Sequence, residues 1–204
     1  MLGTAVRLRP AARGRGGSRN GRGSRRFLAR PRGRAQESSR AEGASVSPTS
    51  LRDTFLAQVV DLLRETFEGG LPGQGTQYLD HSSGIRSTLR SLTAEQASRR
   101  FEGHPSIVAH VRHMNFHLRV TSEWILGDHS RRDWAQSFEP QSVSAEEWPK
   151  LLQELEASRQ ELVRVIESLT PERFAEEGGA IGATAHLAYH LGAIRQVMHR
   201  AIKP

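Results

Sequence analysis

The chain has 204 residues, of which 36% are hydrophobic and 25% are charged; its formal net charge is +7 and it contains no cysteine. This length allows one domain of ordinary size plus a tail, and the lack of cysteine excludes disulfides, thiolate metal sites and a cysteine nucleophile. No uninterrupted apolar run approaches the roughly 20 residues that span a bilayer, so we expect no integral membrane protein and no membrane partner.

The positive charge is concentrated at the N-terminal end. Residues 1–44 hold 12 Arg, no Lys and two acidic residues, a local charge of +10, whereas residues 45–204 carry a charge of −3. The first part contains too few apolar residues to offset the entropy lost on folding. We therefore expect a disordered, Arg/Gly-rich basic tail over residues 1–46 and a folded domain over residues 47–204.

Several interpretations of the tail stay open, and none of them decides the function of the chain. An Arg-rich segment can bind nucleic acid through phosphates, although Phe27 is the only aromatic residue there that could stack on bases. A transit peptide would be amphipathic, and a twin-arginine signal would have an apolar region after residues 24–28; neither feature is present. A start codon assigned too far upstream in GC-rich DNA would also give this composition. We expect nucleic acid as a partner only through this tail.

The first predicted helix begins near Ser47. Apolar residues recur there at three- and four-residue steps over residues 51–63, and the Gly69-Gly70 pair ends the helix. A long loop and a short apolar segment over residues 85–92 follow. The spacing of residues 93–96 is that of a capping box and predicts one more helical turn.

Three further long helices are predicted, each with a single apolar stripe. They run from about Ser106 to Leu126, from Ser144 to Leu169 and from about Ala180 to Ile202. The stripes consist of Ile107, Val111, Met114, Leu118 and Ile125; of Trp148, Leu152, Leu155, Leu162, Ile166 and Leu169; and of Leu187, Leu191, Ile194 and Met198. No segment alternates with period two, so strands are not expected. Four amphipathic helices predict an all-α fold and, more specifically, a four-helix bundle.

All nine histidines lie after residue 80, and five of them show the spacing of metal ligands on two of these helices: His110, His113, His117, His186 and His190. At about 100° per residue, the first three share one flank of their helix within roughly 60°, and the last two lie roughly 40° apart. An i, i+4 pair places two imidazoles on one face, and a third from a facing helix would complete a three-nitrogen metal site with room for water.

Spacing leaves the set of ligands open. It does not choose among His110, His113 and His117, and the two i, i+4 pairs could also form a four-histidine site. The alternative is that these histidines are half-exposed or polar core residues of a non-enzymatic helical bundle, which binds metal without turnover or acts through dimerisation. The other four histidines are expected in loops or in solvent.

Two stretches of the chain resemble signatures of the DinB/YfiT-like superfamily of metal-dependent enzymes. Residues 106–114 (SIVAHVRHM) resemble the first signature, and residues 185–196 (AHLAYHLGAIRQ) resemble the second more densely. Residues 132–134 and 144–148 also fit the family pattern. The resemblance covers roughly residues 50–204 and leaves the tail unmatched.

This resemblance implies an up-down-down-up four-helix bundle that holds a divalent metal on three histidines. The family's first ligand falls on His113, and its closing pair falls on His186 and His190. Zinc or nickel is the first expectation for the metal, with iron or manganese also compatible. His110, His117 and Tyr189 are then candidates for residues around the ligands. The helical wheel puts His113 furthest from the apolar stripe, which leaves His110 or His117 as its replacement.

Two kinds of chemistry follow from a metal on three neutral imidazoles. In a hydrolase, zinc would lower the pKa of bound water to about 7. In a thiol (S-)transferase, which the resemblance also suggests, the same Lewis acid would pass a low-molecular-weight thiol to an electrophile. No Asp or Glu lies convincingly on the histidine faces, so no catalytic base is assigned. We expect a cytoplasmic homodimer that acts on a small molecule, with the non-enzymatic bundle as the alternative.

Overall fold

The computed structural model describes residues 48–203 except 71–72, 74, 171–172 and 174–176. Within these residues the fold is all-α, as predicted, because the chain forms helices and two isolated bridges but no strand. No helix in this part of the chain combines the length and apolar character needed to cross a membrane. The predicted disordered tail, residues 1–46, lies outside the described residues and stays a prediction.

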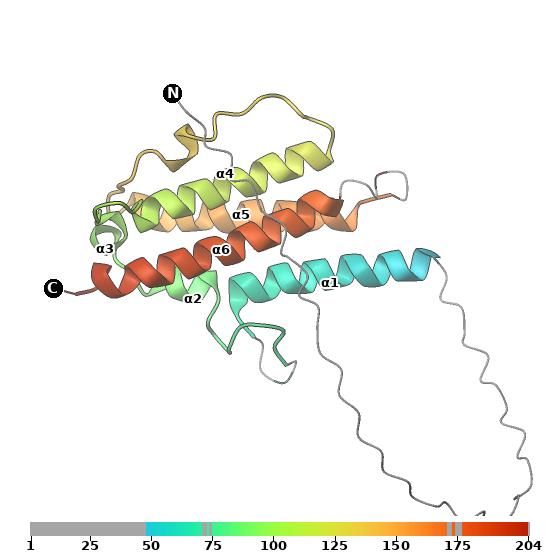
Figure 1. The fold of residues 1–204 in the computed structure, drawn as a ribbon, viewed down its shortest axis with the longest axis horizontal. Helices are drawn as coiled ribbons and strands as arrows, with labels where there is room; N and C mark the ends of the chain where they lie inside the picture. Colours follow the sequence, from blue (N-terminus) through green and yellow to red (C-terminus); the bar gives the residue numbers. More distant parts are fainter. Residues whose placement is uncertain (1–47, 71–72, 74, 171–172, 174–176, 204) are drawn as a thin grey trace, which may run out of the picture. The chain divides into compact units, whose positions relative to one another are not determined.

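Four long helices account for most of the described part of the chain (Figure 1): α1 (Pro48–Glu68), α4 (Ile107–Ile125), α5 (Glu147–Glu167) and α6 (Glu177–Ala201). Shorter helical segments connect them: α2 (Ile85–Arg90), α3 (Ala94–Ser98) and the 3₁₀ helix η1 (Gln136–Phe138). The four long helices and the turn of α3 were predicted, residues 85–92 were predicted only as a short apolar segment, and η1 was not predicted. Helix α6 begins about three residues earlier than expected.

The ends of the helices follow from local side-chain hydrogen bonds. Ser106 caps α4 by accepting a hydrogen bond from the backbone N–H of Ala109 at 3.1 Å. Residues 93–96 form the predicted capping box at the start of α3. Ser144 and Glu147 exchange the two hydrogen bonds of a second box, at 2.8 and 3.2 Å, and the regular part of α5 starts at Glu147.

Helix α4 lies at the centre of the core. It packs against both α5 and α6, and α1 packs against α6 and α5. The predicted stripe of α4 is fully buried or nearly so, and it meets the buried leucines of α6. On α1, Val59 and Leu63 are buried as expected, but Phe55 is 38% exposed. Since most apolar stripes face one shared interior, their burial fixes the position of α4 relative to α6.

Two polar contacts fasten the shorter segments to the long helices. The buried carboxylate of Glu65 on α1 accepts hydrogen bonds from the backbone N–H groups of residues 77–79, in the loop before α2. The indole Nε1 of Trp148, at the start of α5, donates to the carbonyl oxygen of Leu92 at 3.1 Å. These contacts fix the connection between α1 and α4.

The connection between α4 and α5 forms a turn that covers one flank of α4. The carboxylate of Asp133 accepts hydrogen bonds from the backbone N–H groups of Ala135 and Gln136, at 3.1 and 3.2 Å. This arrangement holds the first residues of η1, which packs against α4. The flank that it covers is the one that carries the histidines.

Candidate metal centre

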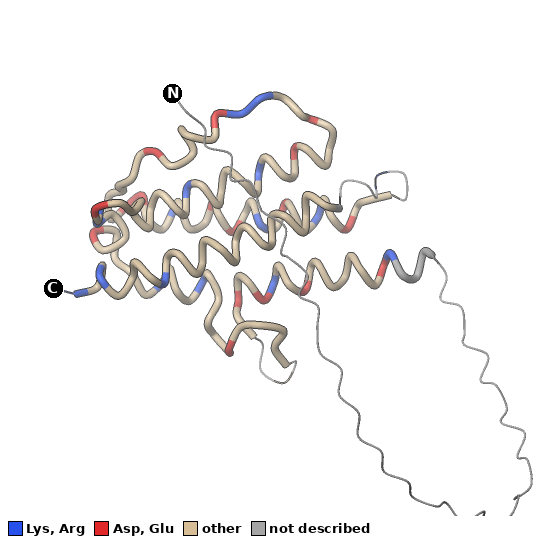
Figure 2. The backbone as a smooth tube through the Cα atoms, viewed as in Figure 1, with Lys and Arg blue, Asp and Glu red and all other residues tan. Residues whose placement is uncertain are grey.

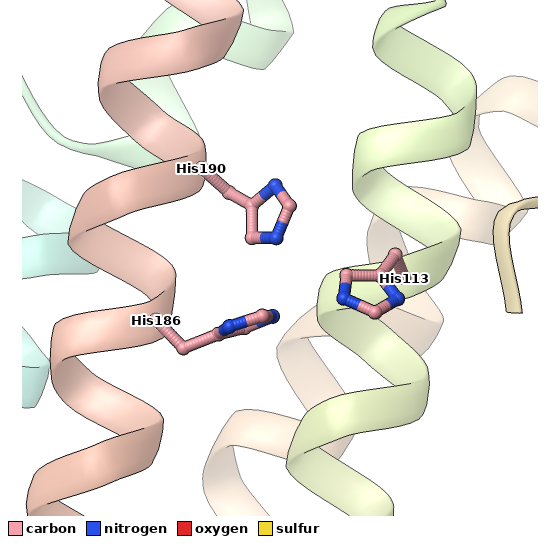
Figure 3. Close-up of side chains that lie close together, drawn as sticks. All are labelled: His113, His186 and His190. Carbon is pink, nitrogen blue, oxygen red and sulfur yellow. The ribbon is translucent and has the colours of Figure 1, made fainter. Parts of the chain in front are cut away.

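Histidines from α4 and α6 point toward one another across the gap between the two helices (Figure 3). His113 comes from α4, and His186 and His190 come from successive turns of α6. Each residue offers one ring nitrogen, and the three nitrogens lie within 4.8 Å of one another. The structure thus brings together the three histidines that the family resemblance pointed to.

His113 is buried, although the helical wheel put it furthest from the apolar stripe. It is 7% exposed because η1 covers this flank of α4. The ring of Phe138 stacks on the imidazole of His113 with centroids 3.9 Å apart and planes 13° apart. The hydroxyl oxygen of Ser137 lies 2.5 Å from Nδ1 of the same ring. A helical wheel counts only the helix's own apolar stripe, so it could not show that a covering loop buries this residue.

His110 and His117 lie beside the three-histidine group rather than within it. Nδ1 of His110 is 2.8 Å from Nδ1 of His190, which is a hydrogen-bond distance. The ring of His117 stacks on that of His186, with centroids 3.9 Å apart and planes 14° apart. Among the described residues, the nitrogens that converge within 4.8 Å belong to His113, His186 and His190. The four-histidine alternative therefore receives no support from the geometry.

Two aromatic residues border the group. Tyr189 is 70% exposed, and its ring meets that of His190 edge-on at a centroid distance of 5.2 Å. Trp134, which is 39% exposed, meets His113 at 6.2 Å and His117 at 5.7 Å. The sequence predicted Tyr189 near the ligands but gave no role to Trp134, which lies in a stretch that fits the family pattern.

The surroundings of the histidines keep their rings neutral. Figure 2 shows few charged residues along α6, and the sequence from Gly178 to Ile194 contains none. Burial, together with the neighbouring imidazoles, lowers the pKa of His113 and His117 to about 4 and that of His190 to about 3. Burial also lowers the pKa of His186. A metal binds the neutral form of imidazole, so no proton has to be displaced near pH 7.

The available lone pairs fit a divalent cation. Nδ1 of His113 is engaged by Ser137, and Nδ1 of His190 is engaged by His110. Nε2 of His186 is buried and has no hydrogen-bond partner in the described part of the chain. A buried polar atom without a partner is costly unless something binds it. Three neutral nitrogen donors suit zinc, nickel or iron.

The other four histidines lie away from this group. His81, His104, His129 and His199 are all exposed, as expected. The sequence-based prediction missed Ser137 and Phe138, because the three residues of η1 are too few to show a periodicity. The available signal was Asp133, a residue that commonly starts such a turn, followed by two aromatic residues.

Comparison with known families supports the resemblance seen in the sequence. The family model of the DinB superfamily matches residues 77–200, which is more than half of the chain and includes all five clustered histidines. Searches of curated proteins and of solved structures gave no match. With the three-histidine group placed between α4 and α6, the match shows that this chain belongs to the DinB superfamily.

Proposed function

We propose that this protein is a metal-dependent enzyme whose divalent cation is held by His113, His186 and His190. The observation that carries the proposal is the convergence of three ring nitrogens within 4.8 Å, from two helices that are far apart in sequence. A packed pair of helices fixes the positions of the three rings before any ligand binds. Such preorganisation is typical of a binding site and is unusual for surface histidines.

The chemistry that fits this donor set is Lewis-acid catalysis. When bound, a cation on three neutral imidazoles keeps its full charge and an open position, so it can polarise a substrate and favour the ionised form of water or a thiol. The residues of the chain orient the rings and shield them from water. Trp134 and Tyr189 border the group and would contact the body of a small substrate.

The surroundings favour thiol transfer over hydrolysis as the reaction. A thiol has only to lose one proton, and the positive charge of a cation favours that loss without a base from the protein. Hydrolysis also requires a proton for the leaving group. In the part of the chain that the structure describes, no carboxyl group is hydrogen-bonded to any of the five clustered rings. We therefore rank thiol transferase first and hydrolase second.

We also propose that α1, α4, α5 and α6 form an up-down-down-up four-helix bundle. The packing of α4 against α5 and α6, and of α1 against α6, supports this arrangement. A homodimer, a cytoplasmic location and a low-molecular-weight thiol or another small molecule as substrate stay predictions. The identity of the metal, with zinc or nickel ranked before iron or manganese, is part of the same proposal.

The test is the metal content of the purified protein and of alanine variants. Wild type should hold about one equivalent of divalent metal per chain under metal-replete conditions, and His186→Ala should lose it because one donor of three is gone. His199→Ala is the matched control, since His199 lies on the same helix but is exposed and outside the group. Wild-type protein without metal would refute the proposal.

A second step separates an enzyme from a metal-binding bundle without turnover. The metal-loaded protein is incubated with a small thiol and an alkylating electrophile, and in parallel with simple esters and amides. Metal-dependent loss of the free thiol, abolished in His186→Ala, supports the transferase. Ester or amide cleavage without thiol consumption supports the hydrolase instead. Bound metal without either reaction, across a broad panel of substrates, favours the non-enzymatic alternative.

A further inference from the structure

The hydroxyl group of Ser137 lies between two hydrogen-bonding partners. Its Oγ is 2.5 Å from the carbonyl oxygen of Trp134 and 2.5 Å from Nδ1 of His113. A carbonyl oxygen can only accept a hydrogen bond, and a serine hydroxyl has a single proton to donate. The hydroxyl proton therefore goes to Trp134, and Ser137 must accept from His113. It follows that the proton of the neutral His113 ring is on Nδ1 and the lone pair is on Nε2.

We infer that Ser137 is a positioning residue of the metal centre: it fixes the tautomer of His113 so that Nε2 is available as a ligand. This inference rests on the metal site proposed above. A metal-binding histidine commonly donates its other N–H to a nearby acceptor, and this bond sets the direction of the lone pair. In this protein the acceptor is a side chain from η1. The loop thus takes part in the site without supplying a ligand.

The contacts around Ser137 restrain both the position and the plane of the His113 ring. Asp133 caps the turn and so holds η1 in place. Phe138 stacks on one face of the imidazole and fixes its plane. Ser137 then selects one of the two ring orientations related by a half-turn flip about the Cβ–Cγ bond, since Nδ1 has to point at the hydroxyl oxygen. Stacking alone would also allow the flipped ring, in which the positions of Nδ1 and Nε2 are taken by carbon atoms.

The other two histidines of the group differ from His113 in this respect. His190 is paired with a second imidazole, His110, and either ring can donate in that bond. No hydrogen bond to His186 is found among the described residues, and its buried Nε2 has no partner. Of the three, only His113 has a tautomer that the hydrogen-bonding pattern determines. This makes Ser137 the position where a single substitution should change ring orientation without removing a ligand.

The first test uses the metal-free protein and needs no enzyme assay. Long-range ¹H–¹⁵N correlation spectra distinguish the two neutral tautomers of histidine, and the signals of His113 can be assigned by their loss in His113→Gln. Wild type should show the proton on Nδ1, and Ser137→Ala should shift the ring toward a mixture of tautomers. A wild-type ring protonated on Nε2 would overturn the inference.

The second test measures the dissociation constants of zinc and cobalt(II) by competition with a chelator. Ser137→Ala should weaken binding about 10- to 100-fold, the usual effect of removing the partner of a ligand. Ser137→Thr keeps a hydroxyl and should restore most of the affinity. Ser158→Ala is the matched control, since Ser158 is as buried as Ser137, at 8% exposed, and its hydroxyl bonds Asn115 rather than a histidine. It should lower stability but leave the affinity unchanged.

The outcomes separate this inference from the proposed function. If wild type binds zinc and Ser137→Ala binds it equally well, the role of Ser137 is refuted and the metal site stands. If Ser158→Ala weakens binding as much as Ser137→Ala does, the effect is one of general stability, which also refutes the role. If wild type binds neither metal, the proposed site itself is wrong.

Discussion

Replacing Glu65 by Gln should lower the stability of the fold more than most single substitutions of a charged residue do. Glu65 is only 8% exposed, and its carboxylate accepts hydrogen bonds at 2.7 Å from the backbone N–H groups of Gln77, Tyr78 and Leu79. Burial raises the pKa of Glu65, but these backbone hydrogen bonds outweigh burial and hold the pKa below its ordinary value. The charged form is therefore the one that fastens this loop to α1.

The size of the effect follows from the hydrogen bonds. The amide of Gln can still accept at one oxygen, but two bonds change from charge-assisted to neutral, and its NH₂ group faces the N–H of Gln77 in place of the second oxygen. A hydrogen bond to a charged group contributes about 1.5–3 kcal/mol to stability, and a neutral one contributes about 0.5–1.5 kcal/mol. The expected loss of stability is therefore about 2–4 kcal/mol, since water can replace part of the bond to the exposed N–H of Gln77.

The assay is urea unfolding of both proteins from pH 7 down to the acid limit of the native state. A carboxylate whose folded pKa is depressed contributes its stability above the unfolded pKa, and this contribution is lost as the pH falls through the folded pKa. The difference in the free energy of unfolding between wild type and Glu65→Gln should therefore be largest near pH 7. It should narrow as the pH falls below about 4.5, where Glu in the unfolded chain becomes protonated.

The matched control is Glu161→Gln. Glu161 is an exposed residue of α5 that pairs with Arg164 one turn away, and such surface pairs contribute about 0–1 kcal/mol. The reasoning on the strength of these hydrogen bonds would be refuted if Glu65→Gln lowered the free energy of unfolding by less than about 1 kcal/mol at pH 7. It would also be refuted if the difference in this free energy between wild type and variant did not change with pH.

Three further predictions concern the fold and the metal. Gly84→Ala should destabilise the protein by about 3 kcal/mol or more, because the new Cβ would lie 2.4 Å from the carbonyl oxygen of Phe67. Gly192→Ala should instead stabilise α6 by about 0.5–1 kcal/mol, because a Cβ at this position meets open space. Urea unfolding of both variants checks these values. Trp148→Phe removes the donor to Leu92 and should cost about 1–3 kcal/mol in the same measurement. Zinc at 100 times its dissociation constant should stabilise wild type by about 2.7 kcal/mol and should not stabilise His186→Ala, as thermal unfolding would show.

The long helices could be predicted because their ends are encoded locally. Ser106 caps α4, and the Ser144–Glu147 box opens α5, through hydrogen bonds to residues only three positions away. The role of Glu65 was not predictable in this way. A glutamate in an amphipathic helix is usually in solvent, and the three N–H groups that it binds belong to a loop with no periodicity.

The selection of three histidines from five also depends on contacts between segments that are distant in sequence. On α4 alone, His110, His113 and His117 share one flank, and spacing cannot separate them. In the folded chain, each of them has a different partner from another segment: His110 bonds His190, His117 stacks on His186, and His113 bonds Ser137. The hydrogen bond of His113 goes to a residue outside α6, so it occupies a nitrogen of neither His186 nor His190. Because η1 holds His113 from behind, its remaining nitrogen is directed at α6. The family resemblance pointed to this residue, although the helical wheel put it furthest from the apolar stripe.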